Sequence, residues 1–404
     1  MSEVRNTVSL GDLSPNGSRQ LGRRSAVCWA DGTVVAGCDD GRLVAVDAET
    51  LAPRWQDDSL SGSVVSLSGT SADVLAGTRG PDGEVRCLDR ETGAVRWRYQ
   101  TADDIGTAQQ DSRFFLPFVV DVLRADDRAY ALARRYERGP DGERQFRSVV
   151  YCFESDGTRR WRHRTDASPI SMDLLGDRLG VAFNRCPGDD GDGVRILDAE
   201  DGTVAGRWDP PGGGQRRCGD LSLLGDGFVA VSHADYRGYR IDGDRRWAVD
   251  LGGPVEQGGE TVYSYPNHVH ATDSGAFFLT GNTYPQEGRE TDERHPNEHT
   301  AVGVGADGTV RWEAETGGFA HGIETAGDSV AVPVAQHFRE RDPSVHGVYT
   351  FDVRDGPVAS TATRGVATAV AVRDGGDAAV AIEEPVAYHD ADSVRGRYCL
   401  RRVL

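Results

Sequence analysis

Short runs of apolar, mostly β-branched residues recur along the whole chain, and the same polar phrase follows each of them. The phrase is an aspartate, a turn of acidic residues or glycine, an arginine and a tryptophan, as in 44–55 and 86–97. Further copies end at Trp161, Trp208, Trp247 and Trp312, and two degenerate copies end at Ser360 and Tyr398. Asp-Gly in the shorter copies supplies the positive φ that a tight hairpin needs. Each copy therefore predicts two antiparallel strands joined by a hairpin.

Two more strand-like segments precede each phrase, for example 25–30 and 32–38 ahead of the first. Self-similarity at such a period indicates a repeat architecture, and a repeat of four short antiparallel strands is typical of a propeller blade. The eight copies predict an all-β fold, an eight-bladed β-propeller with four-stranded antiparallel blades. We expect one propeller over residues 21–404, with residues 1–20 either disordered or forming a closing strand. The blades should begin near residues 24, 61, 107, 166, 211, 253, 318 and 365.

The phrase resembles the repeat of pyrroloquinoline-quinone-type propellers, whose Asp-x-x-Thr-Gly-x-x-x-Trp is matched almost literally by Asp89 to Trp97. The resemblance covers nearly the whole chain, and the family includes quinoprotein alcohol dehydrogenases and the BamB-type scaffold of outer-membrane assembly. It implies that the repeat tryptophan docks between neighbouring blades, where an indole buries a large area and needs one hydrogen bond. We therefore expect structural roles for Trp55, Trp97, Trp161, Trp208, Trp247 and Trp312.

Cysteine usage argues against quinone chemistry. The dehydrogenases that the repeat resembles carry a vicinal cysteine pair over the quinone, whereas the seven cysteines here stand apart, at positions 28, 38, 87, 152, 186, 218 and 399. No motif locates the calcium ligands or the catalytic aspartate of those enzymes. We predict buried, reduced thiols, no cofactor and in particular no pyrroloquinoline quinone.

The chain is acidic, and apart from histidine its only basic residues are arginines. It has 64 Asp and Glu against 45 basic residues, a net charge of −19 and no lysine. An acidic excess keeps a protein soluble at high salt and repels phosphate backbones, so nucleic acid is not an expected partner. No stretch approaches the roughly 18 apolar residues of a membrane-spanning helix, and the first residues lack the order of a signal peptide. We expect a salt-adapted cytoplasmic monomer from a halophilic archaeon.

Histidine is unevenly distributed. Seven of the ten histidines fall in predicted blades six and seven, namely His268, His270, His295, His299, His321, His337 and His346. The first strand of a blade lines the axis, and His268, His270 and His321 open these strands, while the other four lie in or beside loops. We expect all seven to converge at the mouth of the channel. Alternation along a strand puts His268 and His270 on one side, a geometry in which two imidazoles can share a metal.

The first functional hypothesis is a non-enzymatic scaffold or binding platform. It would hold a protein partner or a small ligand on the His-rich loop face of blades six and seven, which extended loops commonly equip for recognition. A charged insertion at 136–145 in blade three is expected to be a solvated loop on the same face. Asp273, Glu324 and Arg339 are candidates to assist. The main candidate residues are His268, His270, His321, His337 and His346.

The alternative hypothesis is a metal-dependent hydrolase or lactonase. His268, His270 and His321 would then bind a divalent metal, and a metal-bound water would be the nucleophile. A third account makes these histidines ordinary polar loop and channel residues that bond to neighbouring blades or to water. A tightly bound divalent metal would separate the enzyme from the platform.

Overall fold

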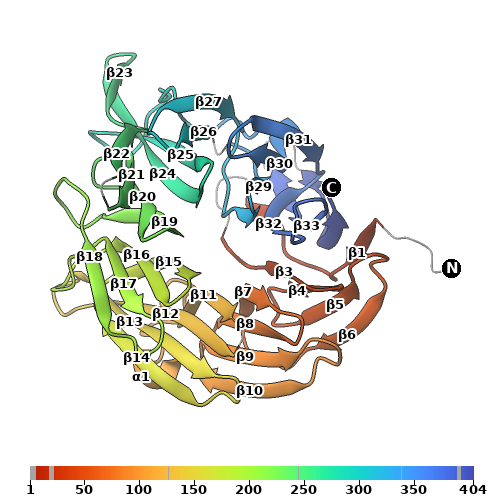
Figure 1. Ribbon diagram of the computed structural model, residues 1–404. Coiled ribbons are helices and arrows are strands. Elements are labelled where there is room, and N and C mark those ends of the chain that lie inside the picture. The colour runs from red at the N-terminus through yellow and green to blue at the C-terminus, as the bar shows by residue number, and fades with distance from the viewer. Residues whose placement is uncertain (1–5, 18–21, 126, 244, 338, 389–392) are drawn as a thin grey trace.

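The computed structural model describes residues 6–17, 22–125, 127–243, 245–337, 339–388 and 393–404. Antiparallel sheets stand in a ring around a central opening (Figure 1). The chain runs once around this ring, from β3 (Ala26–Ala30) to β36 (Cys399–Arg402). Each consecutive run of strands is called a blade below and is named by its strands. The arrangement is that of a β-propeller, as the repeat predicts.

The first half of the ring holds three blades and the one helix of the described residues that lies between them. The β3–β6 blade adds β4 (Thr33–Gly37), β5 (Leu43–Asp47) and β6 (Pro53–Asp57) to β3. The next blade consists of β7 (Ser63–Gly69), β8 (Asp73–Arg79), β9 (Glu84–Asp89) and β10 (Val95–Gln100), and α1 (Ala102–Ile105) follows it. The third consists of β11 (Phe118–Ala125), β12 (Arg128–Arg138), β13 (Arg144–Glu154) and β14 (Arg159–Thr165). One residue pair, Phe118 with Arg79, joins the second and third blades into a continuous sheet.

The middle of the ring continues the same plan and adds one strand. One blade has β15 (Ser168–Leu175), β16 (Arg178–Arg185), β17 (Val194–Asp198) and β18 (Val204–Trp208). The next has β19 (Cys218–Leu224), β20 (Gly227–Ser232), β21 (Arg237–Asp242) and β22 (Arg245–Asp250). The β23–β27 blade has five strands, β23 (Val255–Gln257), β24 (Glu260–Thr272), β25 (Gly275–Pro285), β26 (Thr300–Gly305) and β27 (Val310–Glu315).

The ring closes with strands from both ends of the chain. The β28–β31 blade has β28 (Glu324–Ala326), β29 (Ser329–Val334), β30 (Gly347–Asp352) and β31 (Gly356–Ala362), with a 3-10 turn at Pro343–Val345. The last blade orders β32 (Val366–Val372), β33 (Ala379–Glu384), β36 and β1 (Thr7–Ser9), so an early strand completes it. A small sheet holds β2 (Asn16–Gly17), β34 (Val386–Tyr388) and β35 (Ser393–Arg395). Of the segment 1–20, residues 1–5 and 18–20 lie outside the described residues.

The core lies between blades rather than within them. In one apolar cluster, Val229 and Val231 of β20 pack against Phe278 and Val302 of the following blade. Each sheet has two apolar faces, and the ring buries both of them because every blade covers the next. Among the described residues, no helix has the length and apolar character needed to cross a membrane.

The repeat tryptophans lie at these junctions between blades. The indole N–H of Trp55 donates to the carbonyl of Arg90 at 2.7 Å, and that of Trp161 to Ala199 at 3.1 Å. Both acceptors belong to the turn between the third and fourth strands of the next blade. The same relation joins Trp247 to Ala306 and Trp312 to Val353.

Glycine is needed in these turns because the tryptophan ring lies against them. Gly93, Gly157 and Gly202 have φ of 71°, 85° and 73°, and a Cβ on each would come within 2.7 Å of the ring of Trp55, Trp97 or Trp161. Trp208 packs differently, with its ring 5.8 Å from Phe228 and 5.2 Å from Tyr239. The aspartate of the phrase orders the turn, since Asp89 accepts hydrogen bonds from the amides of Glu91 and Thr92.

The charged insertion of the third blade differs from the prediction. Instead of a solvated loop over 136–145, β12 and β13 pair as far as Arg138 and Arg144, so only the short turn between them is loop. Tyr136 packs between Phe115 and Phe146, with ring centroids 5.0 and 5.6 Å apart. These aromatic side chains, alternating with charged ones, explain why the ladder continues through a charged segment. The preceding connection is long because α1 intervenes, and β11 begins only at Phe118.

Candidate functional site in the central channel

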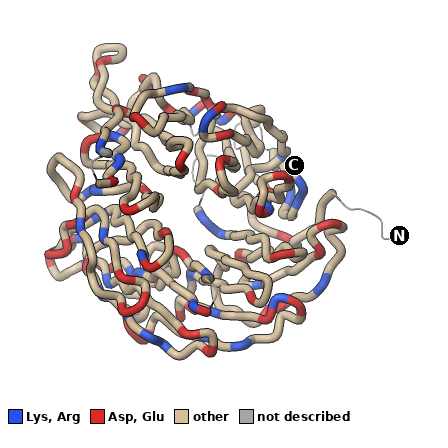
Figure 2. The backbone as a smooth tube through the Cα atoms, viewed as in Figure 1, with Lys and Arg blue, Asp and Glu red and all other residues tan. Residues whose placement is uncertain are grey.

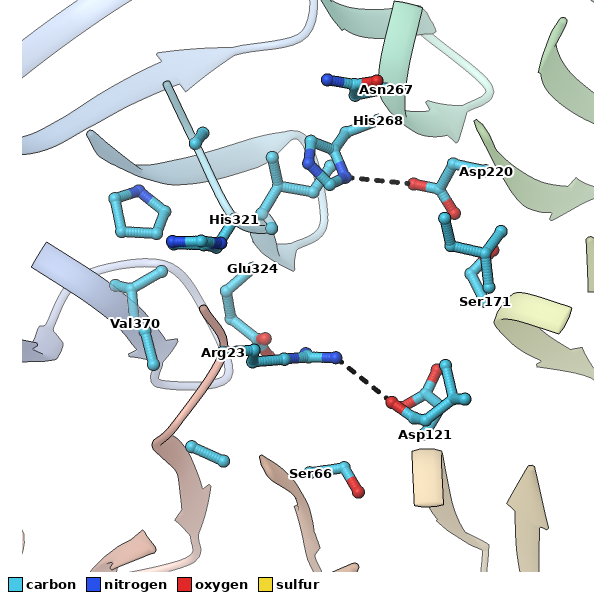
Figure 3. Close-up of a pocket in the computed structure, with 18 of the residues that line it drawn as sticks. Arg23, Ser66, Asp121, Ser171, Asp220, Asn267, His268, His321, Glu324 and Val370 are labelled. Carbon is cyan, nitrogen blue, oxygen red and sulfur yellow. Dashed lines mark hydrogen bonds and ion pairs between the residues drawn. The ribbon is translucent and has the colours of Figure 1, made fainter. Parts of the chain in front are cut away.

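A cavity of about 800 Å³ occupies the centre of the ring. The first strands of the blades supply its polar lining, drawn in Figure 3. Ser66, Asp121, Ser171, Asp220 and His268 occupy equivalent positions, each directly after an irregularity in the pairing of its strand. A bulge re-aims the side chain that follows it, which accounts for one polar group from each of these blades at the channel.

The aspartates of this ring hold neighbouring blades together. Asp121 accepts hydrogen bonds from its own neighbour Val122 at 3.0 Å and from Met172 of the next blade at 3.4 Å. Asp220 likewise accepts from Leu221 at 2.8 Å and from Val269 at 3.1 Å. The carboxylates thus satisfy backbone amides that the bulges leave unpaired. Asp121 and Asp220 therefore have a structural role at the inner edge of the sheets.

Two of the predicted histidines reach the channel. His268 lies with Nδ1 3.7 Å from Oδ2 of Asp220. His321 has a buried Nε2 without a hydrogen-bond partner among the described residues. Burial lowers the pKa of His321 to about 3, and the charges of Arg23, His268 and Arg113 act in the same direction. His321 is therefore a neutral imidazole at physiological pH.

Arg23 and Glu324 lie beside His321 and bring charged groups to the channel, and Arg23 points toward Asp121 (Figure 3). Nη1 of Arg23 donates to the carbonyl of Val120 at 3.1 Å, next to Asp121. Enclosure by the channel walls raises the pKa of Glu324 to about 8, the charge of Asp121 adds to this rise, and Arg23 opposes it. Burial also raises the pKa of Asp121 to about 6. One enclosed arginine thus faces two carboxyl groups whose pKa values are raised.

The other histidines are engaged away from the channel. Nε2 of His270 donates to the carbonyl of Gly327 at 2.8 Å, so it joins two blades. His346 is 1% exposed and bonds to Gln336 and Tyr388, and His295 bonds to the carbonyl of Gly253. His299 bonds to Asn282 at 2.7 Å. Of the seven histidines expected at the channel mouth, the structure brings only His268 and His321 to the cavity lining.

His337 belongs to a buried ionic network centred on Glu298. Oε2 of Glu298 lies 3.0 Å from Nε2 of His337, and Oε1 accepts from Arg339 at 2.9 Å and from the Thr283 amide at 2.8 Å. Burial opposes the ionisation of Glu298, but the bond to His337, the Thr283 amide and nearby positive charge outweigh it and lower its pKa to about 2. The network fixes the long β25–β26 connection against the next blade. We call it the Glu298 network.

The residues do not fit a metal centre. Within the described ranges, no group of three or more His, Cys, Asp and Glu side chains could hold a metal ion. The predicted ligand set of His268, His270 and His321 is divided, because His270 bonds to Gly327 instead. The hydrolase hypothesis therefore lacks its ligands.

The residues do not fit a quinone with its calcium ion either. The seven cysteines are free and buried, and none is adjacent to another. Cys28 lines the channel, but burial raises the pKa of its thiol to about 12, so it stays protonated. A thiol in that state is a packing residue.

Sequence reasoning missed three groups that the structure places at the channel. Arg23 follows a segment without strand character, and Asp121 and Asp220 interrupt otherwise apolar strands. His233 was also overlooked, although its Nε2 donates to the Pro266 carbonyl at 2.9 Å and its Nδ1 lies 2.9 Å from Asn184, so it links three blades. The available signal was the recurrence of a polar residue two positions after an apolar one in five successive blades, at Ser66, Asp121, Ser171, Asp220 and His268.

Comparisons with known proteins agree on the fold. A family model described as outer membrane protein assembly factor BamB matches residues 18–139. The quinohemoprotein alcohol dehydrogenase of Comamonas testosteroni is 35% identical over 86 residues, which span 19% of this chain and only 12% of that enzyme.

Two solved structures extend the likeness to nearly the whole chain. BamB from Moraxella catarrhalis has a TM-score of 0.56 at 14% identity and covers 97% of both chains. A quinohemoprotein alcohol dehydrogenase from Pseudomonas putida has a TM-score of 0.58 at 10% identity, over 95% of this chain and 74% of that one. The chain is a β-propeller with a repeat similar to the PQQ-like one.

Proposed function

We propose that this protein is a non-enzymatic β-propeller scaffold that binds a protein partner beside the channel, on the β19–β22 and β23–β27 blades. The observation that carries the proposal is a group of four tyrosines joined by five ring contacts, called the tyrosine cluster below. Its members are Tyr236, Tyr263, Tyr265 and Tyr284, with ring centroids 4.6 to 6.0 Å apart. None of the four is fully buried, and Tyr284 is 38% exposed.

The composition of this surface suits a protein interface. The guanidinium of Arg216 lies 4.7 Å from the centre of the Tyr265 ring. Tyrosine and arginine are the residue types that contribute most to binding at protein interfaces. The strands β24 and β25 extend 13 and 11 residues and carry three of the tyrosines on a paired ladder, which keeps the surface preorganised.

The comparisons support this class of function. The matching family model and one similar structure are of BamB, described as an outer membrane protein assembly factor, which favours a protein-interaction role. The hypothesis first placed binding on the histidines of blades six and seven. Their engagement in internal hydrogen bonds moves the proposed surface to the neighbouring tyrosines.

We also infer that the ring has eight blades. In support, strands β3 to β36 divide into successive runs, and among the described residues the Phe118–Arg79 pair is the only pairing between named strands that merges two runs. The seven buried free thiols and the acidic composition favour a reducing, salt-rich cytoplasm as the location.

The test of the scaffold role is partner capture followed by a binary affinity measurement. The tagged full chain is used to capture proteins from a lysate of its own cells, and a retained protein is purified. The double variant Tyr263→Ser with Tyr284→Ser should weaken the measured affinity about tenfold or more. The control is Phe114→Ser, an aromatic that is 75% exposed in another blade connection. Equal binding by the double variant, or no direct binding by any purified protein, would overturn the proposal.

A further inference from the structure

A second cavity has a volume of about 590 Å³ and is called the arginine pocket below. It lies where the loop ends of β8, β12, β13 and β16 meet the connection that precedes β11. It adjoins the channel, since Phe118, Arg134, Ile170 and Asn184 line both cavities. The pocket walls carry five arginines, which are Arg79, Arg134, Arg138, Arg144 and Arg185.

Among the described residues, none that lines the arginine pocket is acidic. The charges that act on the three most enclosed guanidiniums are mainly other guanidiniums: Arg113 and Arg134 on Arg79, Arg185 on Arg134, and Arg216 and Arg144 on Arg185. Burial, helped by this repulsion, lowers the pKa of Arg79 to about 9 and those of Arg134 and Arg185 to about 10. The hydrogen bonds that Arg134 donates go to neutral groups, the Ser168 hydroxyl and the Pro169 carbonyl.

The lack of counter-charge in the pocket does not come from a shortage of carboxylates. The chain has 64 acidic residues against 45 basic ones, so carboxylates are abundant. Buried arginines elsewhere use them: Arg86 pairs with Asp57 and Glu84, and Arg195 pairs with Asp190 and Asp192. Enclosed charges are costly unless they are paired, so a protein that leaves several unpaired in one cavity keeps them for an anion from outside.

The remaining walls of the pocket are aromatic. Arg79 and Arg134 lie 4.8 and 5.3 Å from the centre of the Phe118 ring. Phe115, Tyr136 and Phe146 form a contiguous wall beside them. Guanidinium groups bind carboxylate and phosphate oxygens through paired hydrogen bonds, and aromatic walls accept an apolar or ring-shaped body. The volume falls in the range of pockets that hold small ligands.

We propose that the arginine pocket binds a small organic anion with two or more negative charges, phosphate or carboxylate, attached to an apolar or ring-shaped body. Arg79, Arg134 and Arg185 hold the anionic groups, and the wall formed by Phe115, Tyr136 and Phe146 contacts the body of the ligand. The pocket residues that hold the anion are not members of the tyrosine cluster, although the two sites are neighbours, since Arg185 pairs with Arg216 and the Arg216 guanidinium lies over the Tyr265 ring.

The experiment titrates four probes into the purified full chain by calorimetry. ADP combines a ring with phosphates, and benzene-1,3,5-tricarboxylate combines a ring with carboxylates. Pyrophosphate carries charge alone, and adenosine carries a ring alone. Either ADP or the tricarboxylate should bind more tightly than pyrophosphate and adenosine, and added salt should weaken that binding because it screens the charges. The two ring-bearing anions distinguish phosphate from carboxylate as the preferred group.

Two variants make the result specific. Arg134→Gln or Arg185→Gln should weaken binding about ten- to hundredfold, the loss expected when a charge-assisted hydrogen bond is removed. Each should also raise the melting temperature of the ligand-free chain, because it relieves repulsion, so a loss of binding cannot be attributed to misfolding. The control is Arg98→Gln, which removes the same charge from an exposed position on β10.

Three outcomes would overturn the proposal. These are the absence of binding by all four probes, equal weakening by Arg98→Gln and Arg134→Gln, and binding of a hexaglutamate peptide where none of the small anions binds. The last result would assign the pocket to an acidic polypeptide. None of these outcomes bears on partner binding by the tyrosine cluster, which the Tyr263 and Tyr284 variants test separately.

Discussion

The two sides of the ring differ in how their polar side chains are satisfied. On the side of β23–β31, the Glu298 network and the bonds of His295, His299 and His346 pair buried polar groups with one another. On the side of β8–β16, the arginine pocket gathers guanidiniums, and the described residues of its lining include no carboxylate. Acidic and basic residues alternate around the ring in Figure 2, so the arginine pocket is a local exception to the charge pattern. A cluster of one residue type indicates a binding site only when the fold leaves its polar groups without internal partners.

The largest effect is expected when the carboxylate at the centre of the Glu298 network is removed. Glu298→Ala leaves His337 and Arg339 without their buried carboxylate, so it should lower the free energy of unfolding by about 3–5 kcal/mol. Denaturant unfolding at constant salt measures the loss. Glu313→Ala, at an exposed position of β27, is the control. A loss no larger than that of the control would mean that the Glu298 network is dispensable.

A second pair of variants compares a paired arginine with an unpaired one. Arg86→Gln leaves Glu84 and Asp57 without their shared cation and should cost about 2–3 kcal/mol of stability. Arg185→Gln should instead stabilise the ligand-free chain. Melting temperatures of both variants, measured in one buffer, show whether the two substitutions shift stability in opposite directions. Shifts of the same sign would show that paired and unpaired arginines do not differ in their effect on stability.

Buried histidines should contribute to the pH dependence of stability, and His299 on the β23–β31 side is one of them. Burial lowers the pKa of His299 to about 3, against about 6.5 for an unfolded histidine. Below pH 6.5 the unfolded chain therefore binds a proton at this histidine and the folded chain does not. The free energy of unfolding therefore decreases as the pH is lowered. Between pH 6 and 5 this histidine alone should cost about 1 kcal/mol.

The variant that tests this dependence is His299→Asn, because asparagine tolerates the φ of 51° at this position. Unfolding free energies at pH 6 and 5 should differ less in His299→Asn than in the wild type. An unchanged difference between the two pH values in His299→Asn would contradict the assignment of this dependence to His299. Glu298 does not interfere, because its pKa of about 2 places its own contribution below about pH 4.3.

The smallest expected effect is at the channel. His268 faces the cavity and is 3.7 Å from its nearest carboxylate, so His268→Ala should change stability by less than about 1 kcal/mol. Elemental analysis of the wild type, His268→Ala and His321→Ala should show no stoichiometric divalent metal. A metal present in the wild type and lost in both variants would restore the hydrolase hypothesis.

Much of the fold could be predicted because its signals are local. An aspartate that orders a turn, a glycine with positive φ and a tryptophan eight residues after the aspartate act within one hairpin, as Asp89, Gly93 and Trp97 do. Repetition of that hairpin predicts a ring of antiparallel sheets. The extension of β12 and β13 was not predicted, because Tyr136 packs against Phe115, a residue outside the hairpin, as well as against Phe146 within it.

The candidate sites depended on contacts between blades, which local patterns do not contain. The histidines lie close together in the sequence, yet most of them form hydrogen bonds with their own partners in the fold. His295, for example, bonds to Gly253 and His346 to Gln336. The arginine pocket draws on residues from Arg79 to Arg185, separated by whole blades, and no stretch of the chain shows that their counter-charges are missing. Turn chemistry and periodicity are properties of neighbouring residues, so the chain itself specifies the blades. Charge balance in a cavity is a sum over distant residues, and only the closed ring decides it.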